Sequence, residues 1–149
     1  MKRIIFICSG NICRSPMAAV LAENMLRDAA LSAVVISAGT LGLEGRRAAR
    51  EAVQAIDEIG LSLTSHRSQG VSLPLCRMAD HLVVMAPNHE NHLLRLDPSL
   101  RNKIVRMWEF ASTEAPLSAI DDPVNQPVEA FRKTRDLLQA CVQEWIRTL

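Results

Sequence analysis

One segment near the N-terminus holds residue types that together could transfer a phosphoryl group. It is Cys8-Ser9-Gly10-Asn11-Ile12-Cys13-Arg14-Ser15-Pro16, a cysteine and an arginine separated by five residues. A cysteine thiolate can attack phosphorus, and the planar guanidinium of arginine binds two phosphate oxygens at once. The spacing alone is weak evidence, because Cys141 and Arg147 repeat it. That second pair lies in an amphipathic stretch without a glycine or a turn, where a structural role is expected.

The sequence around Cys8 distinguishes the first pair from the second. Residues 3–8 are almost continuously apolar, which is typical of a strand buried on both faces. Ser15 as the cap with Pro16 in the first turn is typical of a helix start. Gly10 allows the turn between them to bend and to approach a ligand closely. The backbone N–H groups of such a turn can surround an anion, and the helix N-terminus adds positive partial charge. In that field Cys8 is expected to ionise readily beneath a phosphate held by Arg14.

A second catalytic group is expected far along the chain. Expulsion of an alkoxide or phenolate is slow without a general acid, and Asp121-Asp122-Pro123 lies in a long segment, 109–127, after the last expected strand. Loops after the first and fourth strands of a parallel sheet emerge at the same edge, so an acid in this segment is expected to reach the phosphate. Taken alone, an Asp-Pro pair is more often a plain turn, which is the interpretation favoured for Asp97-Pro98.

The histidines provide weaker candidates. His89-Glu90-Asn91-His92 resembles a metal motif, but its histidines are three residues apart and lack the His-Glu-x-x-His spacing of zinc enzymes. No metal site is therefore expected. A triad of cysteine, histidine and aspartate is chemically possible, although nothing in the sequence fixes its geometry.

The elements that must position these residues alternate along the chain. Strands are expected at 3–8, 34–38, 81–85 and 103–108, and helices at 17–30, 46–59, 87–96 and 128–149. This alternation predicts an α/β fold with a parallel sheet, right-handed crossovers and helices on both faces. Apolar residues at helical spacing mark the expected inward faces. These are Met17, Leu21, Met25 and Ala29, then Ala52, Ala55, Ile56 and Ile59, and finally Phe131, Leu138, Val142, Trp145 and Leu149.

Composition narrows the class of protein. The 149 residues fit one domain, 1–149, and 48% hydrophobic residues are enough for a core. The 17 Lys plus Arg nearly balance 16 Asp plus Glu without a basic stripe, so neither nucleic acid nor a membrane is an expected partner. No run approaches the roughly 20 apolar residues of a membrane span, and the apolar N-terminus is too short for a signal peptide. Four cysteines are sparse for a secreted disulfide scaffold, which favours reduced thiols in the cytoplasm.

From residue 2 to about 149, the chain resembles the low-molecular-weight protein tyrosine phosphatases. Residues 8–16 match the signature loop of that family nearly residue for residue. Further matches follow in the family's order, at Ser37-Ala38-Gly39-Thr40, His66-Arg67-Ser68, Ala79-Asp80 through Met85, and Asp122-Pro123. The resemblance implies a flavodoxin-like, doubly wound sheet of four parallel strands in the order 2-1-3-4. It also implies a metal-independent hydrolase without a cofactor.

The resemblance assigns roles to individual residues. Cys8 would be the nucleophile, Arg14 the phosphate clamp, and Ser15 the donor of a hydrogen bond to the thiolate. Asp122 would be the general acid, and then the base that activates water against a cysteinyl-phosphate. The phosphate-binding residues would be Ser9, Gly10, Asn11, Ile12, Cys13 and Arg14. Asn11, Ser37 and His66 would support the loop, and Cys13 could form a reversible disulfide with Cys8 under oxidation. The implied partner is a tyrosine-phosphorylated protein.

The substrate pocket departs from the usual family pattern. The chain has no tyrosine, and Val124-Asn125 and Leu41-Gly42-Leu43 stand where family members usually carry aromatic residues. The short second loop resembles bacterial protein arginine phosphatases, but those usually have threonine at the position of Ile12. An apolar Ile12 suits an aromatic ring and offers no hydrogen bond to a guanidinium, which favours phosphotyrosine.

Two other functions share this scaffold. Arsenate reductases need further cysteines in a mobile segment, and Cys76 falls in that general region without a close partner in the sequence. A catalytically silent phosphate-binding or partner-binding module is the other alternative. The intact set of Cys8, Arg14 and Asp122 argues against the silent module.

Overall fold

The protein folds around a four-stranded parallel sheet, as seen in a computed structural model that describes residues 1–112 and 114–149. The strands are β1 (Lys2–Cys8), β2 (Ala33–Gly39), β3 (His81–Val84) and β4 (Ile104–Arg106), in the spatial order β2-β1-β3-β4. The predicted α/β class, strand order and parallel pairing are therefore confirmed.

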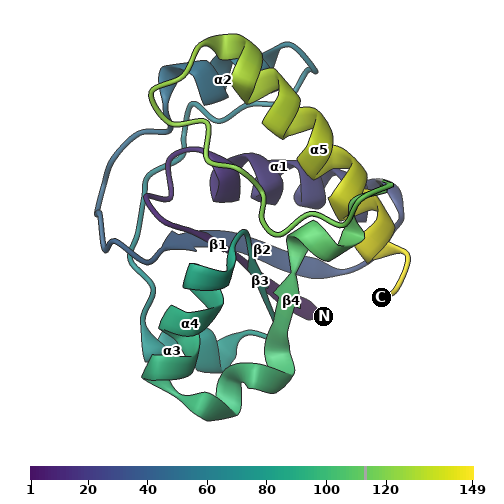
Figure 1. The fold of residues 1–149 in the computed structure, drawn as a ribbon. Coiled ribbons are helices and arrows are strands. Elements are labelled where there is room, and N and C mark those ends of the chain that lie inside the picture. The colour runs from purple at the N-terminus through teal and green to yellow at the C-terminus, as the bar shows by residue number, and fades with distance from the viewer. Residues whose placement is uncertain (113) are drawn as a thin grey trace.

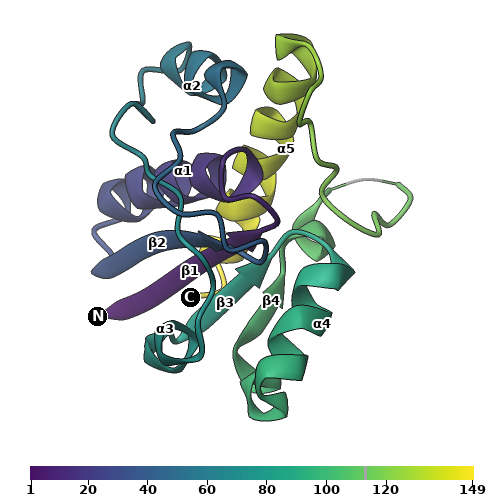
Figure 2. The ribbon, with the colours of Figure 1, turned by 90° about the vertical axis from the view of Figure 1, so that its left-hand side faces the viewer.

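Helices cover both faces of the sheet (Figures 1 and 2). On one face lie α1 (Arg14–Asp28), α2 (Arg50–Asp57) and α5 (Val128–Ile146), and on the other lie α3 (Leu73–Met78) and α4 (Pro87–Leu96). Two 3-10 helices, η1 (Pro98–Lys103) and η2 (Met107–Phe110), flank β4. Because helices pack against both faces of the sheet, residues 4–8 of the central strand β1 are all buried.

The apolar faces predicted for the helices are largely confirmed. Met17 and Leu21 of α1 are buried, as are the central residues Ala52, Ala55 and Ile56 of α2. The prediction fails at the helix ends. Ala29 is exposed beyond the end of α1, and Ile59 is 37% exposed just before Gly60, whose left-handed backbone terminates the turn after α2.

Two helices differ from what the sequence predicted. The helix expected from residue 46 begins only at Arg50, because the preceding backbone is bound elsewhere: the Arg46 carbonyl accepts from Ser68, and the Ala49 N–H donates to the Ile12 carbonyl. Helix α3 was not predicted. Its capping signal is present, since the Ser72 hydroxyl accepts the Leu75 N–H, but six residues are too short to show a helical period.

The carboxyl edge of the sheet brings distant segments together. Cys8 at the end of β1 is paired with Gly39 at the end of β2. A side chain at Gly39 would place its Cβ 2.6 Å from the Ser9 carbonyl oxygen, so the close approach of the two strand ends requires glycine. From the segment after β4, Ile120 returns to this edge and donates its N–H to the Met85 carbonyl at 2.8 Å.

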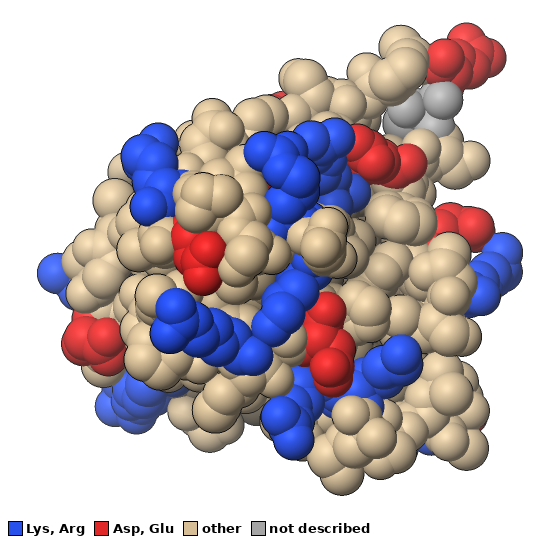
Figure 3. All heavy atoms as spheres, turned by 90° about the horizontal axis from the view of Figure 1, so that it is seen from below, with Lys and Arg blue, Asp and Glu red and all other residues tan. Residues whose placement is uncertain are grey.

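The surface mixes charges of both signs. Viewed from the side of α3 and α4, lysine and arginine side chains are interspersed with aspartate and glutamate (Figure 3). Within the described ranges, none of the helices has both the length and the apolar character that a bilayer crossing requires.

Candidate active site

The loop Ser9–Arg14, called the phosphate loop below, joins the end of β1 to α1. Its left-handed residue is Asn11, with φ of 58°, whereas Gly10 lies outside the left-handed region. The left-handed bend of the loop is therefore made by Asn11 and not by Gly10. Asparagine is one of the few residues with a side chain that tolerates this conformation, because its short amide can hydrogen-bond locally.

Both the side chain and the backbone carbonyl of Asn11 are held by hydrogen bonds. Its side-chain nitrogen donates to the hydroxyls of Ser15 (2.8 Å) and Ser37 (2.9 Å), and its side-chain oxygen accepts the Gln69 N–H (3.0 Å). Its carbonyl accepts from Nε2 of His66 at 2.7 Å. Burial lowers the pKa of His66, so the ring is neutral and carries its proton on Nε2. The structure thus brings together the predicted trio of Asn11, Ser37 and His66.

Ser15 connects this network to the candidate nucleophile. Its Oγ lies 2.9 Å from the buried Sγ of Cys8. Because Ser15 Oγ already accepts a hydrogen from Asn11, its own hydrogen is free to be donated to the sulfur. The prediction that Ser15 caps α1 is wrong, because the N-cap is Cys13 and no side chain caps the helix. The first N–H groups of α1 are left uncapped by side chains, as an anion site at a helix start requires.

Arg14 is buried and held from two sides. Its Nη1 donates to the Ile120 carbonyl at 2.9 Å, and its Nη2 lies 3.4 Å from both Ser9 Oγ and Asp122 Oδ2. Its Nε is buried and has no hydrogen-bond partner among the residues that the structure describes. The edge of the guanidinium formed by Nε and Nη2 is the one that arginine uses to bind two oxygens of a phosphate.

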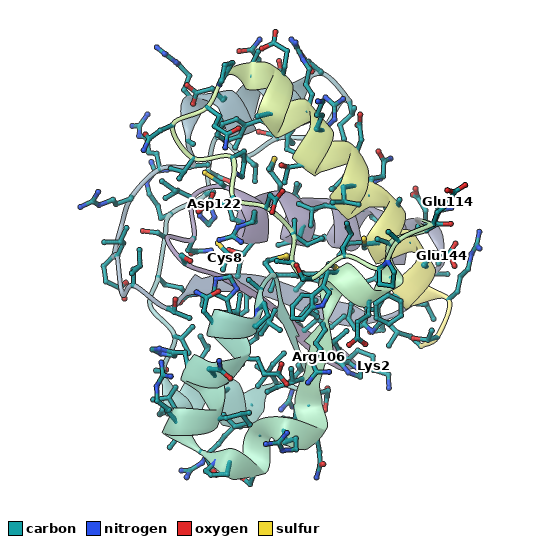
Figure 4. All side chains as sticks on the ribbon, viewed as in Figure 1. Lys2, Cys8, Arg106, Glu114, Asp122 and Glu144 are labelled. Carbon is teal, nitrogen blue, oxygen red and sulfur yellow. The ribbon has the colours of Figure 1, made fainter. Side chains whose placement is uncertain are left out.

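Asp122 reaches the same place from the segment between η2 and α5. Its Oδ1 accepts the Val124 N–H at 3.1 Å, and its Oδ2 faces Arg14. The side chain is 36% exposed, so it stands at the mouth of the site and not beneath it. Figure 4 shows Cys8 and Asp122 in the same region, where the ends of β1 and of the long segment meet. The prediction that this segment returns to the edge that bears Cys8 is confirmed.

The cysteines all carry free thiols, and all four are buried. Burial, reinforced by the negative charge of Asp122, raises the pKa of Cys13 to about 12. Burial alone raises the pKa of Cys141 in α5 to about 11. Arg147, which repeats the spacing of Arg14, pairs with Glu144 on the surface. The second cysteine–arginine pair is thus structural, as expected.

His89 is a site residue that the sequence did not reveal. Its Nδ1 accepts the Ala86 N–H at 3.0 Å, and its Nε2 lies 3.0 Å from Ser9 Oγ. The ring is fully buried, and this burial, together with the nearby charge of Arg14, lowers the pKa of His89 to about 4. The sequence feature that could have indicated His89 is its position in the first turn of the helix that begins at Pro87.

The structure offers no candidate metal site in the ranges that it describes. Residues 1–112 and 114–149 contain no group of three or more His, Cys, Asp and Glu side chains that could hold a metal.

Comparison with known proteins agrees with this geometry. The family model for low molecular weight phosphotyrosine protein phosphatase matches residues 3–149. A low molecular weight protein-tyrosine-phosphatase of Acinetobacter johnsonii is 30% identical over 98% of this chain and 96% of its own length. A protein-arginine-phosphatase of Geobacillus stearothermophilus is 33% identical over 94% of this chain and 90% of its own.

A solved structure extends the likeness to three dimensions. The low molecular weight protein tyrosine phosphatase from T. tengcongensis superposes with a TM-score of 0.91, at 30% identity and with full coverage of both chains. The sequence, the fold and the arrangement around Cys8 lead to one conclusion: the chain belongs to the low molecular weight phosphotyrosine protein phosphatase family.

Proposed function

We propose that residues 1–149 form one phosphatase domain that hydrolyses protein phosphotyrosine through a cysteinyl-phosphate intermediate. The observation that carries this proposal is the chain of hydrogen bonds from Asn11 through Ser15 to Cys8 Sγ, together with the buried Nε of Arg14, which has no hydrogen-bond partner among the described residues. Hydrogen bonding to sulfur favours the thiolate, and Arg14 with the loop N–H groups would hold the phosphate above it.

The proposed reaction has two steps. The Cys8 thiolate attacks phosphorus and forms the S–P bond, while the bond to the tyrosine oxygen breaks and Asp122 donates its proton to that oxygen. Asp122, now a carboxylate, then removes a proton from water, which attacks phosphorus and releases phosphate and the thiolate. Ser15 stabilises the thiolate as it departs. Protein groups supply all the positive charge in this scheme, so it requires neither a metal nor a cofactor.

The proposed preference for an aromatic substrate rests on two apolar side chains at the phosphate loop. An added Cβ at Gly10 would lie 3.5 Å from Ile12 Cγ1 and 3.8 Å from Leu43 Cδ1, so both apolar side chains border the same point of the loop. Contact with an aromatic ring would gain about 25 cal/mol per Å² of apolar surface removed from water. The same surface offers no partner to the N–H groups of a phosphoguanidinium.

We expect Ile12→Thr to shift preference from phosphotyrosine toward phosphoarginine, because threonine removes apolar surface and adds a hydroxyl. The measurement is kcat/KM on peptides of one sequence that carry phosphotyrosine, phosphoserine or phosphoarginine. Ile59→Thr, the same change at a remote site, is the control and should leave the ranking unaltered. A wild-type preference for phosphoarginine would favour the second candidate, an arginine phosphatase, which the similarity to the Geobacillus enzyme supports.

We expect reversible inactivation by peroxide through a Cys8–Cys13 disulfide. The nucleophilic thiolate oxidises first to a sulfenic acid, and Cys13 then displaces water from it. The raised pKa of Cys13 keeps that residue as a thiol near pH 7, so disulfide formation should accelerate as pH rises toward 9. The measurement is the fraction of activity that a reductant restores. Equal irreversible loss in the wild type and in Cys13→Ser would refute the proposal.

Two remaining alternatives are separable by simple assays. Cys76, the cysteine considered for arsenate reduction, is buried in α3, and burial raises its pKa to about 11, which disfavours a role in thiol exchange. Turnover of a generic aryl phosphate would exclude a silent binding module.

We also propose that the protein is located in the cytoplasm. The four reduced, buried thiols support this location.

A further inference from the structure

The hydroxyl of Ser9 occupies a defined position at the edge of the phosphate loop. Its Oγ lies 3.0 Å from His89 Nε2 and 3.4 Å from Arg14 Nη2. A guanidinium nitrogen can only donate hydrogen bonds, so Ser9 Oγ accepts from Arg14. The direction of the Ser9 hydrogen therefore depends on which way the bond to His89 runs.

The backbone of α4 determines the direction of that bond. His89 Nδ1 accepts the Ala86 N–H, so Nδ1 carries no proton. A neutral imidazole with a bare Nδ1 must carry its proton on Nε2, and His89 therefore donates to Ser9. The ring is fully buried, which keeps it in this neutral form. Ser9 Oγ then accepts two hydrogen bonds, and its own hydrogen is left to be donated.

We propose that His89 is a positioning residue that orients the Ser9 hydroxyl hydrogen toward a non-bridging oxygen of the phosphate held by Arg14. The Ser9 side chain thereby becomes a further donor to the phosphate, in addition to the backbone N–H groups of the loop. This inference rests on the phosphate chemistry proposed above, but not on which phosphorylated residue is the substrate. Hydrogen-bond donors that are oriented before the reaction stabilise the transition state most where negative charge develops.

Two substitutions of the same residue separate the bond to Ser9 from the bond to Ala86. His89→Asn retains an oxygen that can accept the Ala86 N–H, but it provides no donor at the position of Nε2. His89→Gln places an amide nitrogen near that position and can still donate to Ser9. We expect His89→Asn to lower kcat/KM on aryl phosphates about 3- to 10-fold, and His89→Gln to stay within about twofold of the wild type.

Three further measurements distinguish positioning from a general structural role. The loss in His89→Asn should be equal for acidic and basic leaving groups, because Ser9 touches the phosphoryl group and not the leaving group. Inhibition by orthovanadate, which adopts a geometry close to the transition state, should weaken more than inhibition by inorganic phosphate. The double variant Ser9→Ala/His89→Asn should lose no more activity than Ser9→Ala, since His89 acts through Ser9.

Clear outcomes would overturn the proposal. Additive losses in the double variant, wild-type activity in Ser9→Ala, or equal losses in His89→Asn and His89→Gln would each show that His89 does not act through Ser9. Thermal unfolding of each variant checks that the fold is intact. If the wild type hydrolyses no aryl phosphate, the proposed function fails separately. Calorimetric binding of phosphate and vanadate to the same variants would still test His89.

Discussion

Cys8→Ser is expected to abolish hydrolysis while the protein continues to bind phosphate. The serine hydroxyl is a far weaker nucleophile than a thiolate, so kcat should fall by about 10⁴-fold or more. Phosphate affinity should change little, because the loop N–H groups and the guanidinium edge of Arg14 are untouched. Steady-state turnover of an aryl phosphate and calorimetric titration with inorganic phosphate measure the two quantities independently.

Cys141 provides the matched control for this experiment. It is a buried cysteine with an arginine six residues later, but it lies within α5 and not at the end of a strand. Cys141→Ala should keep its activity, whatever it does to thermal stability. Wild-type turnover in Cys8→Ser, or full activity in Arg14→Ala, would remove the basis for the proposed mechanism.

Asp122→Ala is expected to lose about 10²- to 10⁴-fold in kcat on substrates with poor leaving groups. Its carboxylate stands at the mouth of the site, 3.4 Å from the guanidinium that would hold the phosphate. The loss should shrink as the leaving group becomes more acidic, because an acidic phenolate departs without a proton. A plot of log kcat against leaving-group acidity, for wild type and variant, measures this dependence.

Asp121→Ala is the control for that assignment. Asp121 precedes Asp122 directly and is exposed, but the ion pair with Arg14 is formed by Asp122. Its substitution should leave the slope of the leaving-group plot unaltered. If Asp121→Ala is the more impaired variant on poor leaving groups, the two neighbouring carboxylates have been assigned the wrong way round.

Much of the site was predictable because its signals are local or topological. The apolar run of β1, the loop composition and the start of α1 occupy one continuous segment, and patterns of this kind express local geometry. Asp122 is 108 residues from Arg14 in the chain. Its approach could nevertheless be inferred, because parallel strands direct the segments that follow them to one edge.

The residues that were missed act through contacts that no local pattern encodes. Gln69 donates its N–H to Asn11 across 58 residues, and His89 reaches Ser9 across 80. The Ile120 carbonyl, which holds Arg14, is a backbone atom and leaves no mark on residue type. The left-handed backbone of Asn11 also left no local signal, because it is secured by a side-chain network whose partners are distant in the sequence.

The left-handed backbone of Asn11 ties stability and turnover to one side chain. For most residues with a side chain that conformation costs about 1–2 kcal/mol, and the cost is incurred when the chain folds, before any substrate arrives. Glycine would remove the strain, but it would also remove the amide that directs Ser15 toward Cys8. It would leave the other buried partners of that amide, Ser37 and the Gln69 N–H, without their hydrogen bonds, at about 1–3 kcal/mol for each unpaired group. Selection for heat resistance and selection for catalysis therefore both retain asparagine at position 11, and an evolving lineage cannot exchange one property for the other there.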